Sequence, residues 1–312
     1  MKKTLILFSF LVFTFAEGYA QSAEQLWNDA IALHDSDKNA EALDIITRAI
    51  AIDSTDARFY DLKGRCEVPL KMYVEAFASM NKAISLEPKE SYLRANRANL
   101  LLNVGEYDAA MSDVIIAIEL AKSDTMKHHM ISLRGLTKSL QMNYEGAYED
   151  YQIVYKFDPT SIANLSNLAT ACGRMGKHKE ALKYLLEAYK LVPGDHAILV
   201  NLGFQYQKSG DYKQSVEYFD KALSLNPNDP LAMNNRGYSK LKMGDTEGAI
   251  MDVNQSIALY PNNSYAYRNR ALIYIEQKRI KEACIELETA ASKGFTKFYG
   301  PEVDDLLIKY CK

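Results

Sequence analysis

Apolar residues recur at spacings of three and four along most of the chain, which is the pattern of amphipathic helices. The pattern itself recurs every 34 residues, and eight successive repeats begin at residues 23, 57, 91, 128, 162, 196, 230 and 264. Three additional residues, Thr125-Met126-Lys127, lengthen the third repeat. Each repeat holds two helices, and such a pair covers its apolar faces only by stacking on its neighbours. The pattern therefore predicts an all-α array of stacked helix pairs.

Small residues and prolines fall at fixed positions of the repeat. Position 8 is always Gly or Ala: Ala30, Gly64, Ala98, Gly135, Ala169, Gly203, Gly237 and Ala271. Position 20 is Ala in every repeat but one (Ser215), and position 27 is Ala except at Val154 and Ser256. Small residues where two helices cross let their backbones approach closely. Pro cannot continue a helix, so it fixes the turn at the end of five repeats: Pro88, Pro159, Pro193, Pro227 and Pro261. Pro69 should shorten the first helix of the second repeat.

The sixth repeat shows these positions most fully, at Leu199, Leu202, Gly203, Tyr206, Gly210, Asp211, Tyr212, Phe219, Ala222 and Pro227. In these residues the chain resembles the tetratricopeptide repeat (TPR), from residue 23 to about residue 297. The resemblance implies a right-handed α-solenoid of eight antiparallel helix pairs that binds other proteins or extended peptides and has no catalytic activity or cofactor. A further helix at about residues 299–311 is expected to cap the last repeat, as such arrays require.

Charged residues at positions 7 and 23 vary together between repeats. Arg at position 7 accompanies Asp or Glu at position 23 in four repeats, as Arg97-Asp113, Arg134-Asp150, Arg236-Asp252 and Arg270-Glu286. Where position 7 is Leu168 or Leu202, position 23 is Tyr184 or Tyr218. We predict an ion pair between the two helices of each of these four repeats. Such a pair specifies which helices pack together more than it adds stability, because desolvation of both ions offsets their attraction.

The first twenty residues have the pattern of a secretory signal peptide. Lys2 and Lys3 precede an apolar run from Leu5 to Ala16, and Gly18-Tyr19-Ala20 places small residues before a cleavage site after Ala20. Twelve apolar residues are too few to span a bilayer of roughly 30 Å. The sequence thus predicts a signal peptide at 1–20, a single array at 21–312, and export to the periplasm or the extracellular space, with no transmembrane segment after cleavage.

Composition argues against several other functions. The net charge is −3 and the charges are scattered, so no basic stripe indicates a nucleic-acid partner. The sequence has no glycine-rich phosphate loop, no paired-His zinc motif and no nucleophile elbow. We therefore expect no metal, no cofactor and no enzymatic activity.

Four cysteines occur in a chain that is expected to be exported, where disulfides can form. In the array that the resemblance implies, Cys284 starts the last repeat helix and Cys311 ends the capping helix, so we hypothesise a disulfide between them. The alternative is two buried free thiols. Cys66 and Cys172 lie in distant repeats and are interpreted as small core residues.

A row of asparagines at position 6 supplies the candidate binding site. In TPR proteins the first helices line the concave face, and this row is similar to the asparagine ladder of glycosyltransferase TPR arrays. A carboxamide both donates and accepts, so it can pair with a peptide backbone of any sequence. Bracing of neighbouring helices is the alternative. With nearby aromatic and basic positions, the candidates are Asn96, Asn167, Asn201, Asn235, Asn269, Phe204, Tyr238, Lys208, Lys242 and Tyr265.

A further reading of this surface stays open. Asn201, Lys208, Asn235 and Lys242 match part of the carboxylate clamp of other TPR proteins.

The leading functional hypothesis is a scaffold for protein interactions in the cell envelope. The alternative is a chaperone-like receptor for exposed peptide segments of client proteins. An accessory subunit of an enzyme complex is a weaker alternative, and self-association through an exposed end of the array is a further one.

Overall fold

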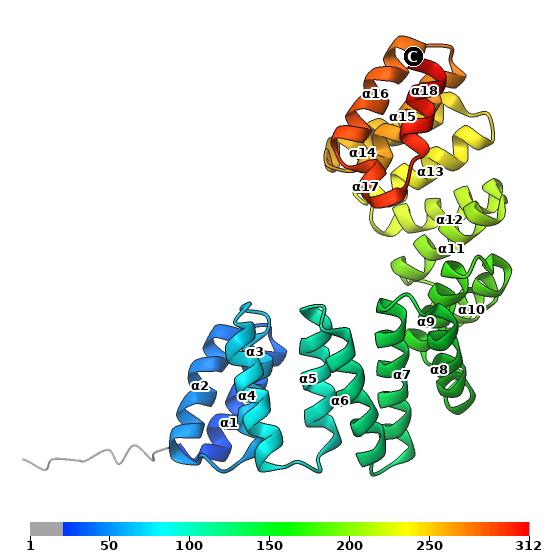
Figure 1. The fold of residues 1–312 in the computed structure, drawn as a ribbon. Helices are drawn as coiled ribbons and strands as arrows, with labels where there is room; N and C mark the ends of the chain where they lie inside the picture. The colour runs from blue at the N-terminus through cyan, green and yellow to red at the C-terminus, as the bar shows by residue number, and fades with distance from the viewer. Residues whose placement is uncertain (1–20, 312) are drawn as a thin grey trace, which may run out of the picture. The chain divides into compact units, whose positions relative to one another are not determined.

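The computed structural model describes residues 21–311, so the predicted signal peptide lies outside the described residues. Within that range the regular secondary structure is entirely α-helical (Figure 1). The first helices of the eight pairs are α1 (Ala23–Asp35), α3 (Ala57–Glu67), α5 (Ser91–Asn103), α7 (Asp124–Leu140), α9 (Ile162–Arg174), α11 (His196–Ser209), α13 (Pro230–Lys242) and α15 (Ser264–Glu276). The second helices are α2 (Asn39–Ile52), α4 (Tyr73–Leu86), α6 (Tyr107–Leu120), α8 (Tyr144–Phe157), α10 (His178–Leu191), α12 (Tyr212–Leu225), α14 (Thr246–Leu259) and α16 (Ile280–Ser292).

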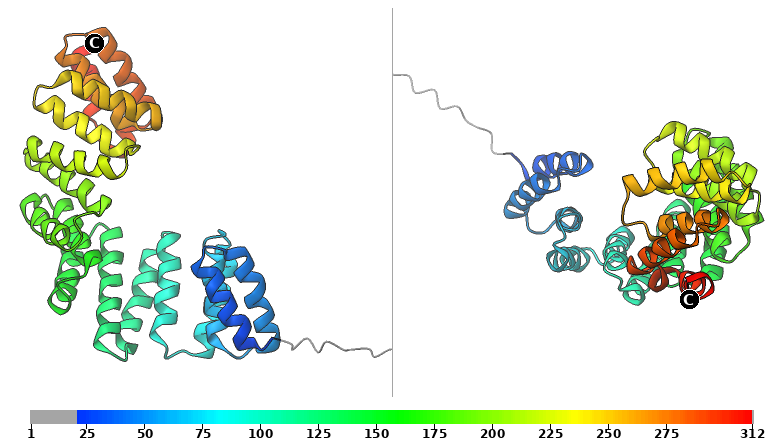
Figure 2. Two further views of the ribbon diagram at one scale, coloured as in Figure 1. Left: turned by 180° about the vertical axis from the view of Figure 1, so that it is seen from behind. Right: turned by 90° about the horizontal axis from the view of Figure 1, so that it is seen from above.

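The helices form two compact units. The N-terminal unit contains α1–α6 and ends at Leu120, and the C-terminal unit runs from Ala121 through α18. In each unit every first helix packs against the second helix of its own repeat, and the second helix packs against the first helix of the next (Figure 2). This arrangement is an all-α solenoid of helix pairs. No helix among residues 21–311 is long and apolar enough to cross a bilayer.

Local sequence explains where individual helices start and stop. The side chains of Asp195 and Asp229 accept backbone N–H groups in the first turns of α11 and α13, which caps these helices. Gly210, at φ 85°, ends α11 in the left-handed conformation that glycine adopts without strain. As Pro69 predicts, α3 is short and ends at Glu67. The additional residues of the third repeat lie in the first turn of α7, so the insertion lengthens a helix.

The two helices of each repeat meet at position 8, where a small residue faces the side chain sixteen residues later. A Cβ atom added at Gly203 would lie 2.8 Å from the ring of Phe219, and one at Gly135 would lie 2.7 Å from the ring of Tyr151. Gly64 faces Met80 and Gly237 faces Val253 in the same way. Four glycines therefore make room for large or branched core side chains at position 24.

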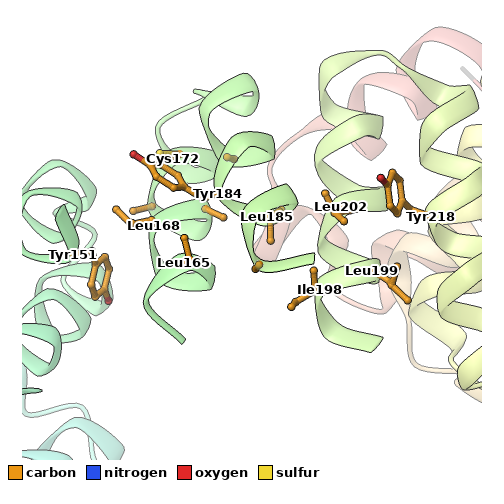
Figure 3. Packing of buried hydrophobic residues seen from close by; sticks show 14 of the residues in the cluster. Tyr151, Leu165, Leu168, Cys172, Tyr184, Leu185, Ile198, Leu199, Leu202 and Tyr218 are labelled. Carbon is orange, nitrogen blue, oxygen red and sulfur yellow. The ribbon is translucent and has the colours of Figure 1, made fainter. Parts of the chain in front are cut away.

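One core cluster of the C-terminal unit crosses repeat boundaries from α8 to α12. Figure 3 shows this cluster, in which side chains of α8–α12 interdigitate across repeat boundaries; it includes Tyr151, Leu165, Leu168, Cys172, Tyr184, Leu185, Ile198, Leu199, Leu202 and Tyr218. The two serines that replace Ala at positions 20 and 27 are buried and hydrogen-bonded. Ser215 Oγ lies 2.8 Å from Ser239 Oγ, and Ser256 Oγ donates to the carbonyl of Pro230 at 2.6 Å.

Ion pairs join the two helices in the four repeats with Arg at position 7. The Nη2 atom lies 2.6 Å from the carboxylate in Arg97-Asp113, 2.7 Å in Arg134-Asp150, 2.6 Å in Arg236-Asp252 and 2.9 Å in Arg270-Glu286. Three of these carboxylates also contact a second cation that sequence reasoning missed: Arg94 for Asp113, Lys138 for Asp150 and Lys240 for Asp252. The buried carboxylates are thus well compensated.

Two short helices, α17 (Phe295–Tyr299) and α18 (Glu302–Cys311), cover the end of the last pair. Phe295 and Val303 are buried against Leu287 and Ala290 of α16 and Ala271 of α15. A disulfide joins Cys284 near the start of α16 to Cys311 at the end of α18, with a Cα–Cα distance of 5.7 Å. The thiols of Cys66 and Cys172 are free and buried.

Because the contact at Gly203 is tight, Gly203→Ala should change the free energy of unfolding in opposite directions in the wild-type chain and in a Phe219→Leu variant. Ala is favoured over Gly in a helix by about 1 kcal/mol, yet overpacking a core costs about 1–3 kcal/mol. In the wild-type chain Gly203→Ala should lower the free energy of unfolding, because three ring atoms of Phe219 lie within 2.9 Å of the new Cβ. In a Phe219→Leu background the same change should raise it. Urea denaturation of the four variants measures both effects, and equal effects in the two backgrounds would disprove the packing argument.

Candidate binding groove

A groove with a volume of 940 Å³ runs across the first helices of the C-terminal unit. It is lined by side chains of α9, α11, α13 and α15 and, at its C-terminal end, by Tyr299 and Glu302 of the cap. Repeat positions 6, 9 and 13 contribute because spacings of three and four residues lie on one face of a helix. Consecutive first helices therefore present equivalent side chains to the same groove.

Seven of the ten residues predicted to bind peptide line this groove: Asn201, Asn235, Asn269, Phe204, Tyr238, Lys208 and Tyr265. Asn167 and Lys242 lie on the same helices outside the lining, and Asn96 belongs to the N-terminal unit. The lining also includes residues that sequence reasoning did not select. Among them are Gln205, Asn234, Asn263, Arg268, Tyr299 and Glu302.

The asparagine row divides into two kinds of residue. Asn96 Nδ2 donates to both carboxylate oxygens of Asp61 at 2.9 and 3.0 Å. Asn269 is buried, and its Nδ2 donates to Asn234 Oδ1 at 2.9 Å. At these two positions the carboxamide braces neighbouring first helices, which is the alternative that the sequence left open.

Asn201 and Asn235 are the free members of the row within the groove. Asn201 is exposed and Asn235 is half-buried, and within residues 21–311 neither carboxamide hydrogen-bonds to another group of the protein. The braced and the free carboxamides differ in the residue at position 5 of the preceding repeat. Asn96 and Asn269 donate to that position, which is Asp61 or Asn234. Asn201 and Asn235 follow repeats in which position 5 is Ser166 or Val200. Two carboxamides on adjacent helices thus face the groove without partners.

Aromatic rings and cations lie beside these carboxamides. Lys208 Nζ lies 5.3 Å from the ring centre of Phe204, and the Arg268 guanidinium lies 5.1 Å from that of Tyr238. These distances are typical of cation–π contacts, which hold the rings and charges in place. Arg174, Lys208 and Arg268 line the groove against one carboxylate, that of Glu302, so its charge is positive on balance.

Backbone positions in the groove are held by a buried polar network between α11, α12 and α13. Gln207 Nε2 donates to the carbonyl of Asn235 at 2.7 Å and to Ser239 Oγ at 2.9 Å. Ser239 in turn contacts Ser215. The network fixes the spacing of the two helices that carry Asn201 and Asn235, because each member has its partner inside the protein. No cluster of three or more potential metal-ligand side chains occurs among the described residues.

The helix pairs that carry the groove form an α-solenoid of helical hairpins. Family models of the tetratricopeptide repeat match residues 163–195, 196–229, 218–251 and 253–285. The chain therefore contains tetratricopeptide repeats between residues 163 and 285. No curated protein matches it.

Two solved structures have the same fold. A chain of the APC/C hetero-tetramer Cut9–Hcn1 is similar with a TM-score of 0.66 and 18% identity, over 95% of this chain and 57% of that chain. The pilF protein of Pseudomonas aeruginosa is similar with a TM-score of 0.59 and 18% identity, over 70% of this chain and 98% of that one. This chain spans little more than half the length of the first, and at these identities the likeness establishes the fold.

The brace at Asp61 should make stability depend on pH. Asp61 is buried, and burial raises its pKa from 3.8 to about 6, although the hydrogen bonds from Asn96 act in the opposite direction. The folded protein therefore binds this proton more tightly than the unfolded chain, and wild-type stability rises as pH falls through 6. Asp61→Asn keeps the contact and cannot ionise. Between pH 7.5 and pH 5 the free energy of unfolding of the wild type should rise by about 1 kcal/mol relative to that of Asp61→Asn, as measured by denaturant unfolding. A difference between the two proteins that stays constant with pH would contradict the raised pKa of Asp61.

Proposed function

We propose that this protein is an exported scaffold that binds an extended peptide segment of a partner protein in the groove of its C-terminal unit. The TPR fold supports a role in protein–protein interaction. The observation that carries the peptide proposal is the pair of unpartnered carboxamides, Asn201 and Asn235, on adjacent helices. Each can offer both a donor and an acceptor to the backbone of an extended chain.

The flanking side chains suit a segment with apolar and acidic residues. Phe204 and Tyr238, at position 9 of consecutive repeats, lie beside the free carboxamides and give apolar area for side chains of the bound segment. Lys208 and Arg174 favour negative charge. Backbone hydrogen bonds then supply affinity without sequence preference, and the aromatic and basic side chains supply selectivity.

Export is the second part of the proposal, and its main support is the sequence of residues 1–20. The disulfide between Cys284 and Cys311 gives further support, because disulfides persist in oxidising compartments and are rare in the cytosol. A scaffold in the cell envelope is the function that joins this location to the TPR fold.

Peptide binding can be tested by panning a displayed library of random peptides against the purified chain from residue 21 and measuring the affinity of the selected peptides. The double variant Asn201→Ala/Asn235→Ala should weaken binding about tenfold, because two hydrogen-bonding groups together contribute roughly 1–3 kcal/mol. Gln255→Ala removes an exposed carboxamide on α14 and is the matched control. Failure to select any peptide, or equal affinity for the double variant, would refute the proposal.

The location can be tested by expressing the full chain in a bacterium with two membranes. We expect mature protein in the periplasmic fraction with Gln21 as its first residue, because cleavage is predicted after Ala20. Intact-mass spectrometry gives the cleavage site, and a cytoplasmic marker enzyme controls for leakage. Uncleaved protein in the cytoplasm would contradict export.

A further inference from the structure

At the C-terminal end of the groove a buried cation meets an acidic side chain of the cap. Arg268 of α15 is buried, with 9% of the whole residue exposed. Its Nη2 atom forms an ion pair with Glu302, the first residue of α18. Its Nη1 atom donates to Asn269 Oδ1 at 2.8 Å. A buried guanidinium needs a negatively charged partner, and the cap supplies it here.

The pairing leaves hydrogen-bond donors of two groove-lining residues unused. The Nε atom of Arg268 is buried without a hydrogen-bond partner among the described residues. The Nδ2 atom of Asn263, also with a relative exposure of 9%, is likewise buried and unpartnered, and both residues line the groove. A guanidinium binds a carboxylate best through two parallel hydrogen bonds. Glu302 pairs with the Nη2 atom alone. A carboxylate that accepted hydrogen bonds from both Nε and Nη2 would therefore bind Arg268 through one more bond than Glu302 does.

The acidic partner is held less firmly than the cation. The Glu302 side chain is 46% exposed, whereas that of Arg268 is 11% exposed. Glu302 is the first residue of α18, and its neighbour Val303 is buried in the core of the cap, whereas the side chain of Glu302 is exposed. Rotation of this exposed side chain can therefore release Glu302 from Arg268 while the cap stays packed on α15 and α16.

We propose that Arg268 forms a carboxylate subsite of the groove and that Glu302 is its internal occupant in the free protein. On binding, a carboxylate of the partner segment displaces Glu302 and takes the Nε and Nη2 donors of Arg268. The inference rests on the proposed peptide-binding function and adds a chemical requirement for an acidic group at the capped end. That group is either an Asp or Glu side chain or the carboxyl terminus of the segment.

Glu302→Gln tests the competition, because it removes the internal charge from an exposed residue and preserves its shape. Peptides selected on the wild-type chain should carry an acidic group and should bind Glu302→Gln about fivefold more tightly, since the competing ion pair is worth roughly 1 kcal/mol. Glu247→Gln, on the exposed surface of α14, is the matched control and should leave affinity unchanged. Each peptide is also made with an amidated C-terminus: loss of the gain assigns the carboxyl terminus, and its persistence assigns a side chain.

A second measurement separates this inference from the proposed function. Glutarate is titrated into the full mature chain while the Nε–Hε NMR signal of Arg268, identified by its loss in Arg268→Lys, is followed against sodium chloride of matched ionic strength. Saturable shifts at lower glutarate concentration in Glu302→Gln than in wild type support the subsite, even if no peptide is selected. If glutarate causes no saturable shift in Glu302→Gln, the subsite is refuted. If the selected peptides bind the wild-type chain and Glu302→Gln equally, the subsite is also refuted, while peptide binding in the groove stands.

Discussion

The close approach of two helices at position 8 is the constraint on which the rest of the structure depends. A helix pair can form only where the side chain at this position is small enough for the opposing residue sixteen places later, and glycine admits Phe219, Tyr151 or Met80 there. The contact fixes the crossing point of each pair. Because the crossing point is fixed, positions 6, 9 and 13 of successive first helices in the C-terminal unit face the same groove.

The sequence could predict the repeat architecture because its signals are local and recur many times. Helices start at Ala23, Ala57, Ser91 and Ile162, which are the first residues of their predicted repeats. The early end of α3 also had a cause that is visible in the sequence, Pro69. The pairing of Gly with Phe219 or Tyr151 at positions 8 and 24 was also present in the sequence and could have been found. The place of the insertion was not predictable in the same way, because three residues can lengthen either a loop or a helix.

The candidate site was predictable only in part, since its properties depend on pairs of repeats. An asparagine at position 6 has the same local sequence signal whether it is free or engaged. Its state is set by position 5 of the preceding repeat, as Asp61 with Asn96 and Val200 with Asn235 show. Arg268 and Glu302 are separated by 34 residues, one full period of the repeat. That relation was hidden because the cap lacks the other repeat positions.

The disulfide has a consequence for how the C-terminal unit comes apart. Arrays of this kind are held by nearest-neighbour contacts, so their end repeats open first and opening spreads inward. A covalent link between Cys284 and Cys311 ties the last helix to the last pair and so opposes fraying at that end. The capped end is therefore a kinetically protected terminus, and it is the end at which Arg268, Tyr265 and Tyr299 line the groove. A segment seated there would contact an end whose amide hydrogens exchange with water more slowly than those of an unlinked end would.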